Sequence, residues 1–175
     1  MNIRASLNWG LSDELKAAFS SVIPVSRPLI TDQQILDPNW LAGFTTAEGC
    51  FLINTYKSNT KTGVSATLRF QLTQHNRDEA LMRSLIEYLG CGGYYFRSGH
   101  EVGDYRVSKF LDLTDKVIPF FLKYPILGVK AEDFKNFCVV AALIKDNKHL
   151  TKQGLEQIQK IKLGTNKGRF LKCIS

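Results

Sequence analysis

The sequence predicts an α+β domain in which helices cover one face of a four-stranded antiparallel sheet. Two pairs of adjacent strand-like segments, each pair joined by a polar, turn-forming loop, indicate two β-hairpins. One of these strands alternates strictly between apolar and polar residues, which indicates a sheet with one buried and one exposed face. Segments with apolar residues at helical spacing precede, separate and follow the hairpins, and this order favours the α+β class.

The first helix of this domain is expected to begin at Pro38, with Asp37 as its cap, because proline suits a first helical position that needs no backbone donor. Trp40, Leu41 and Phe44 give this helix an apolar stripe. Another side carries only small side chains, and its glycine costs about 1 kcal/mol relative to alanine, so we expect a packing role there. The small residues are Ala42, Gly43, Thr46 and Ala47.

The same helix ends in a carboxylate, because Glu48 is followed by Gly49, which can serve as a C-terminal exit. A carboxylate at the negative end of a helix dipole is poorly placed for stability, so the position indicates a functional role. The simpler interpretation is an exposed acid at a helix end with no function.

Two strands follow this helix and form the first hairpin. The first runs from Cys50 to about Lys57, and the polar segment 57–63 indicates the hairpin loop. The return strand has an apolar face made of Val64, Ala66, Leu68, Phe70 and Leu72. Its opposite face is polar and consists of Ser65, Thr67, Arg69, Gln71 and Thr73.

The remaining elements repeat the same pattern. Asn76 and Glu79 form a capping-box pattern at the start of a second helix. Segments 92–97 and 104–110 are expected to form the second hairpin, with Tyr105 pointing inward. Helical periodicity then predicts three further helices, at residues 116–124, 130–147 and 151–163.

Composition narrows the functional classes. Residues 145–175 hold eight Lys or Arg and two Asp or Glu, so most of the net charge of +7 lies there. A basic excess indicates nucleic acid as a partner, although a solvated basic surface explains the charge equally well. The sequence has no apolar run of membrane-spanning length. Its four cysteines are far apart, which argues against a zinc site or a disulfide framework and favours a reducing compartment.

Residues 41–49, with the sequence LAGFTTAEG, resemble the LAGLIDADG signature of a family of homing endonucleases. Five positions are identical to the signature, Phe44 and Glu48 are conservative changes, and Thr45 and Thr46 depart from it. The expected order of elements, αββαββαα, also matches one repeat of the family fold, whose sheet forms a saddle. The resemblance covers about residues 37–169.

Only one copy of the motif is present, so the chain resembles the C-terminal half of a single-chain member. On this resemblance, residues 1–36 correspond to an N-terminal linker, residues 37–170 to the endonuclease domain and residues 171–175 to a tail. Organellar introns often encode members of this family, so the resemblance implies an intracellular setting and favours the mitochondrion.

The resemblance implies a site-specific endonuclease that hydrolyses both strands of double-stranded DNA. Since the family site takes one acid from each of two motif helices, a homodimer on a long pseudo-palindromic target is expected. The dimer interface would contain Ala42, Gly43, Thr46 and Ala47. Two Glu48 carboxylates would then share a divalent cation, Mg²⁺ or Mn²⁺, with the carbonyl of Ala47 as a further ligand. In the family, residues placed as Gln74 and Lys130 organise water and stabilise phosphate charge.

The exposed face of the predicted sheet would bind the DNA. Arginine suits guanine and Asn or Gln suits adenine in the major groove, and these types dominate that face. An ordinary solvated sheet surface is the alternative. The expected DNA-binding residues are Asn54, Tyr56, Ser58, Ser65, Thr67, Arg69, Gln71, Tyr95, Arg97 and Arg106.

Two other functions remain open at this point. The same fold serves intron-splicing cofactors (maturases) that bind RNA, and a half-domain can bind nucleic acid without cutting it. A half that requires a different partner half is the third alternative, and the sequence does not distinguish it from a homodimer.

Overall fold

The computed structural model describes residues 13–21, 35–59 and 63–166. The chain divides into two units, Met1–Gln33 and Gln34–Ser175, and each is described by itself. In the first unit the described part is a short helix, α2 (Asp13–Ala18), whose residues are all exposed. The predicted tail and most of the predicted linker lie outside the described residues, so the domain boundaries at 36 and 170 stay predictions.

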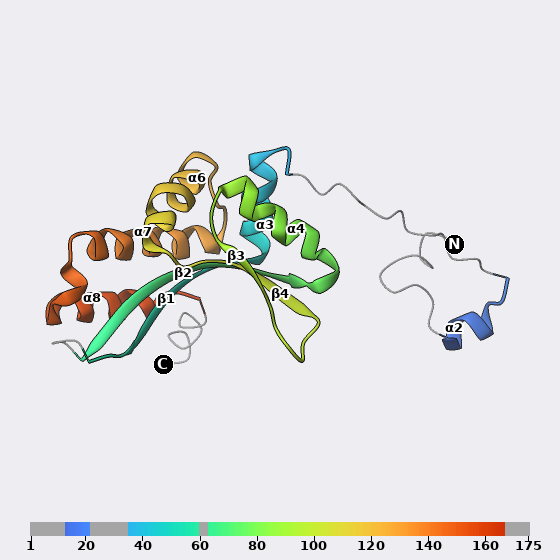
Figure 1. The fold of residues 1–175 in the computed structure, drawn as a ribbon, viewed down its shortest axis with the longest axis horizontal. Helices are drawn as coiled ribbons and strands as arrows, with labels where there is room; N and C mark the ends of the chain where they lie inside the picture. Colours follow the sequence, from blue (N-terminus) through green and yellow to red (C-terminus); the bar gives the residue numbers. More distant parts are fainter. Residues whose placement is uncertain (1–12, 22–34, 60–62, 167–175) are drawn as a thin grey trace. The chain divides into compact units, whose positions relative to one another are not determined.

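The second unit confirms the predicted α+β fold. Its four strands form one antiparallel sheet in the order β1-β2-β4-β3. Helices α3, α4, α6 and α7 lie on one side of this sheet, and the other side forms an open arch (Figure 1). The strands are β1 (Gly49–Lys57), β2 (Val64–His75), β3 (Gly93–Phe96) and β4 (Val102–Val107). The helices are α3 (Pro38–Glu48), α4 (Glu79–Leu89), α5 (Phe110–Asp112), α6 (Ile118–Lys123), α7 (Val129–Lys145) and α8 (Lys152–Lys162).

Aromatic residues from the sheet and the helices fill the core between them. Phe51 of β1 stacks on Phe70 of β2 with ring centroids 5.2 Å apart. Phe121 of α6 and Phe137 of α7 pack against these two rings at centroid distances of 5.3–5.4 Å. All four side chains are buried, as the predicted alternation in β1 and β2 requires. Helices cover this face of the sheet, so the polar face of the same strands is the exposed one.

The start of α4 differs from the predicted capping box. Strand β2 continues to His75, and Asn76–Asp78 forms a 3-10 turn before α4. The Nδ1 atom of His75 accepts a hydrogen bond from the Arg77 N–H at 3.2 Å. His75 therefore caps the turn, because Asn76 already lies inside it. At the other end, Gly90 adopts the left-handed conformation (φ 64°) that ends α4 as its sequence position indicates.

The segment after β4 was also predicted with wrong boundaries. β4 ends at Val107, and helical structure begins at Phe110 rather than at Lys116. A π-helical turn, Leu113–Val117, joins α5 to α6. This wide turn ends two residues before Pro119, whose ring clashes with the carbonyl four residues back in a regular α-helix. Within the described residues, no helix has the length and apolar character needed to cross a membrane.

Candidate active site and nucleic-acid interface

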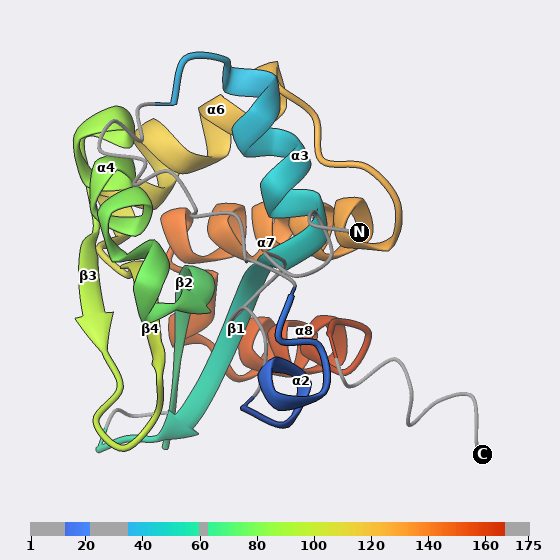
Figure 2. The same ribbon diagram turned by 90° about the vertical axis from the view of Figure 1, so that its right-hand side faces the viewer.

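Helix α3 runs directly into strand β1, and this junction positions Glu48 (Figure 2). The side chain of Asp37 caps the helix by accepting the Asn39 N–H at 2.8 Å, as predicted. At the other end, Gly49 has an extended backbone (φ −68°, ψ 150°). A Cβ atom at Gly49 would lie 2.6 Å from the Thr45 carbonyl oxygen, so only glycine fits this close passage. Glu48 is thereby held exposed at the end of α3.

The outer side of α3 is apolar and exposed. Leu36, just before the helix, is 88% exposed, and Trp40 is 43% exposed and stacked on Phe44 at a centroid distance of 5.0 Å. Gly43 and Ala47 continue this exposed side one and two turns further along. We call the surface made by these five residues the outer face of α3. Exposed apolar groups in such a row are typical of a surface that another protein element covers.

Two of the four residues predicted to contact a second helix do not lie on the outer face. Ala42 is only 5% exposed, so its side chain packs within its own domain. Thr46 donates its hydroxyl to the Ala42 carbonyl at 2.8 Å and accepts the Leu127 N–H at 3.2 Å. It therefore ties the connection between α6 and α7 to α3. Of the four small residues, Ala42 and Thr46 therefore make contacts within the domain, whereas Gly43 and Ala47 lie on the outer face.

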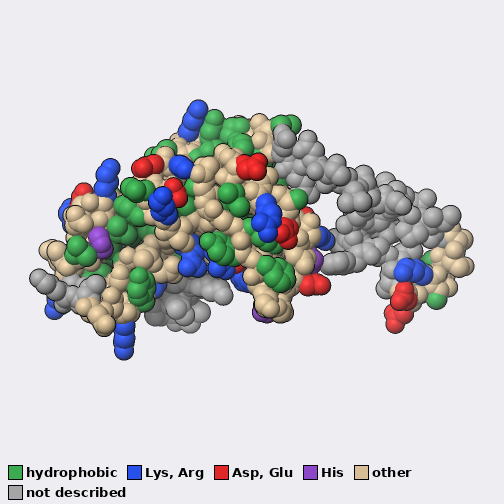
Figure 3. Space-filling model, viewed as in Figure 1, with side chains coloured by type: hydrophobic (Ala, Val, Ile, Leu, Met, Phe, Trp, Pro, Cys, Tyr) green, Lys and Arg blue, Asp and Glu red, His purple; other side chains and the backbone are tan. Residues whose placement is uncertain are grey.

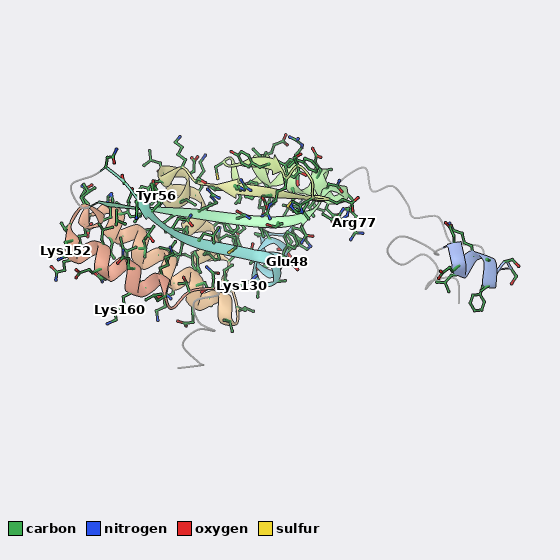
Figure 4. All side chains as sticks on the ribbon, turned by 90° about the horizontal axis from the view of Figure 1, so that it is seen from below. Glu48, Tyr56, Arg77, Lys130, Lys152 and Lys160 are labelled. Carbon is green, nitrogen blue, oxygen red and sulfur yellow. The ribbon has the colours of Figure 1, made fainter. Side chains whose placement is uncertain are left out.

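Lys130 and Gln74 lie near the end of α3, although both are distant from it in sequence. The Nζ atom of Lys130, in the first turn of α7, donates to the Ala47 carbonyl oxygen at 2.5 Å. Figure 4 shows Glu48 and Lys130 at the same end of β1, with Tyr56 at the other end. Strand register places Gln74 two residues beyond Leu72, which pairs with Gly49, the residue directly after α3.

The end of α3 presents oxygen atoms of the kind that Mg²⁺ prefers. These are the exposed carboxylate of Glu48 and the carbonyl of Ala47. The Lys130 ammonium donates to the same carbonyl, so a metal cation there would share this oxygen with Lys130. Among the described residues, no group of three or more His, Cys, Asp or Glu could hold a metal ion. The residues therefore fit a divalent cation only if a second protein element supplies further ligands.

The open face of the sheet carries the polar side chains that the alternation predicts. Cross-strand pairs place Asn54 beside Thr67 and Tyr56 beside Ser65. The next strand pair places Gln71 beside Arg106. Figure 3 shows Lys and Arg side chains along the lower side of this unit, where the open face lies. All ten predicted DNA-binding residues belong to β1–β4 or to the residues directly after them, and their contact with DNA stays a prediction.

Sequence reasoning missed one residue of this face, Asp104. Its carboxylate is 0% exposed and sits beneath two arginines. Arg97 donates to it from Nε at 2.6 Å and from Nη2 at 2.7 Å, and Arg106 donates from Nη2. Thr73 and Gln71 of β2 also donate to it, at 2.6 Å and 3.1 Å. Strand alternation alone could have placed Asp104 on the same face as Arg106, two residues away.

These contacts set the ionisation of the cluster. Burial raises the pKa of the Asp104 carboxyl, but hydrogen bonds from Arg97, Thr73 and Arg106 outweigh it and hold the pKa below its ordinary value. The hydrogen bond to Asp104 raises the pKa of Arg97 in turn. The carboxylate is therefore charged near neutral pH, and Arg97 and Arg106 are bound side chains rather than free ones.

Comparisons with known proteins agree with the fold. The LAGLIDADG endonuclease family model matches residues 41–141. A Neurospora crassa protein named Probable intron-encoded endonuclease 3 is 40% identical over 159 residues, which cover 90% of this chain and 30% of that protein. The solved structure of the I-SmaMI LAGLIDADG homing endonuclease bound to cleaved DNA superposes with a TM-score of 0.91 at 45% identity.

That superposition covers 96% of this chain and 56% of the I-SmaMI chain. A second I-SmaMI structure, bound to an uncleaved DNA target in the presence of calcium ions, gives a TM-score of 0.90 at 44% identity and covers 95% of this chain and 57% of that one. The chain thus spans about a third of the curated relative and just over half of these solved chains. Because the family model matches more than half of its residues and the fold is shared, this chain belongs to the LAGLIDADG endonuclease family.

Proposed function

We propose that this chain supplies one half of a metal-dependent, site-specific homing endonuclease, and that two copies act together on a long pseudo-palindromic DNA target. The observation that carries the proposal is the exposed Glu48 at the end of α3, beside the Ala47 carbonyl and Lys130. One such carboxylate is half of a site. The apolar outer face of α3 offers a surface through which a second copy would bring the other half.

Each residue has a defined task in this proposal. Glu48 and the Ala47 carbonyl would hold Mg²⁺ or Mn²⁺, which when bound lowers the pKa of a water and stabilises charge on the leaving oxygen. Lys130 carries a positive charge to the place where the scissile phosphate would lie. Gln74, two residues beyond the partner of Gly49 in β2, would hold a water by its amide. The outer face of α3 excludes bulk water when it is covered.

DNA would lie against the open face of the sheet. The ten predicted residues, Asn54 to Arg106, offer donors and acceptors at positions spread across all four strands. The I-SmaMI structures, which are bound to DNA, support DNA as the partner. Because the relative is intron-encoded, the proposal includes a mitochondrial setting for the chain.

The experiment compares Glu48→Gln with Glu87→Gln, an exposed acid on α4 that gives the same change of charge. DNA targets are selected from a randomised near-palindromic library, and cutting is measured with Mg²⁺ while binding is measured in EDTA. We expect Glu48→Gln to bind its target and leave it uncut, and Glu87→Gln to cut normally. Cutting by Glu48→Gln at the wild-type rate would contradict the proposal.

A second candidate is a half that pairs with a different half rather than with its own copy. The superposition on I-SmaMI favours this candidate, because this chain matches just over half of one I-SmaMI chain. Sedimentation of the purified chain separates the two candidates. A stable dimer supports the homodimer, whereas a monomer that binds DNA without cutting supports the different partner half or a non-cleaving binder.

A further inference from the structure

Four of the ten predicted DNA-binding residues converge on one buried acid. Gln71, Arg97 and Arg106 bond to Asp104, and Tyr95 lies opposite it in the β3–β4 pairing. The Tyr95 ring also faces the Arg106 guanidinium, with its centroid 5.2 Å from the Arg106 Cζ atom. We call these five residues together with Thr73 the Asp104 cluster. It occupies the half of the open face made by β4, β3 and the end of β2.

The cluster hides the acid and exposes the arginines. Asp104 has no exposed surface, whereas the side chains of Arg97 and Arg106 are 40% and 28% exposed. A ligand on the open face would therefore meet guanidinium groups and not the carboxylate. Since Asp104 cannot reach a base, any effect it has on DNA recognition must pass through the arginines that it holds.

The bonds leave donors available on both guanidinium groups. Arg97 uses Nε and Nη2 for its two-point contact, so its Nη1 group has no partner within the described residues. Arg106 uses Nη2 alone for the carboxylate, and its guanidinium also lies over the Tyr95 ring. Arginine has five N–H donors in a rigid fork, so both side chains keep N–H groups for an acceptor outside the protein.

We propose that Asp104 is a positioning residue for base recognition, which holds Arg97 and Arg106 in a fixed array that discriminates the base pairs lying under β3 and β4. Guanine, with two acceptors on its major-groove edge, is the base that such donors select. Arginines ordered before binding lose less conformational entropy when they meet DNA. This inference deepens the proposed function and rests on DNA binding by the open face.

Asp104 also limits attraction to DNA of any sequence. Its charge offsets one of the two guanidinium charges in the cluster, so replacing it by a neutral residue adds one net positive charge at the face. Binding to phosphates alone would then strengthen while base discrimination weakens. The two effects have opposite signs, and this separates a positioning role from a loss of fold, which lowers both.

The experiment uses the full chain with Asp104→Asn, and Glu101→Gln as the matched control. Glu101 lies in the same hairpin, has a 77% exposed side chain and gives the same change of charge. Each variant is mixed with a randomised duplex library in EDTA at several salt concentrations, and the bound duplexes are sequenced. Both variants should steepen the salt dependence by about one unit on the log–log plot. Only Asp104→Asn should lose base preference, by roughly tenfold or more, at a few adjacent base pairs.

An unchanged preference in Asp104→Asn, or a loss spread equally over every position of the target, would overturn the inference. Thr73→Val guards against a variant that fails to fold, because it removes one donor to Asp104 without changing the charge. It should show a smaller loss at the same base pairs, and an unaltered preference there would also count against the inference. A wild-type chain with no sequence preference would overturn the proposed function and this inference together.

Discussion

Gly43 offers the sharpest test of the idea that a second helix covers the outer face of α3. It sits inside an eleven-residue helix, yet a Cβ atom built on it meets nothing within 4 Å among the described residues. Alanine would therefore fit without strain in the isolated chain. A second helix that approaches α3 closely from outside would explain the glycine at this position.

The expected effect of Gly43→Ala differs between the isolated chain and an assembly in which a second helix covers α3. In the isolated chain, Gly43→Ala should stabilise α3 by about 0.8–1.0 kcal/mol through helix propensity. For a domain of this size, the melting temperature should rise by roughly 3–5 °C. In an assembly with two helices in close contact, the added methyl groups should cost about 1–3 kcal/mol. Association should then weaken by a factor of roughly 5 to 150.

The assay is thermal melting at a concentration below the dissociation constant of the dimer, together with sedimentation over a range of concentrations. Ala142→Gly is the matched control, because Ala142 is exposed on α7 and the change reverses the propensity effect. It should destabilise the chain by about 1 kcal/mol without altering assembly. If Gly43→Ala gains stability while assembly and cleavage keep wild-type values, the outer face of α3 is not the interface and the reasoning fails.

Three other predictions follow from the same geometry. Lys130→Met should reduce cutting by about 100-fold or more while target binding in EDTA persists, because its ammonium lies at the Ala47 carbonyl; equal losses of both would contradict this role. Gly49→Ala should destabilise the chain by about 1–3 kcal/mol in urea unfolding, since the new Cβ would lie 2.6 Å from the Thr45 oxygen, and a neutral effect would show that the junction relaxes freely. Asp104 has a lowered pKa, so its stabilising effect should be full above the unfolded pKa of about 4 and fade as the pH falls below it; an Asp104→Asn stability deficit that stays constant from pH 7 to pH 3 would refute this.

The parts of the fold that depend on local pattern were predictable from the sequence. The alternation from Val64 to Leu72 identified the buried and open faces of β2 before any strand was paired. Asp37 and Pro38 identified the cap and the first residue of α3. In each case a single segment carries the information, because the periodicity or the cap belongs to that segment alone.

The remaining parts depend on contacts between distant segments. The Asp104 cluster requires β4 to pair with β2, which the strand order β1-β2-β4-β3 settles only in the folded chain. The sequence presents Arg97 and Arg106 as free basic residues, and their shared acid appears only after that pairing. Likewise, Ala42 looks like part of a bare helix side, but packing of α3 against its own domain buries it.

The central claim is that two copies of this chain each contribute one Glu48 to a shared centre. The most direct test mixes wild-type chain with Glu48→Gln, lets the subunits exchange, and measures double-strand cutting of a near-palindromic target with Mg²⁺. At equal amounts, about a quarter of the dimers carry two intact carboxylates, so cutting should fall to about a quarter of the wild-type rate. A fall to only one half, in proportion to the wild-type chain present, would mean that each Glu48 acts alone and would contradict the account.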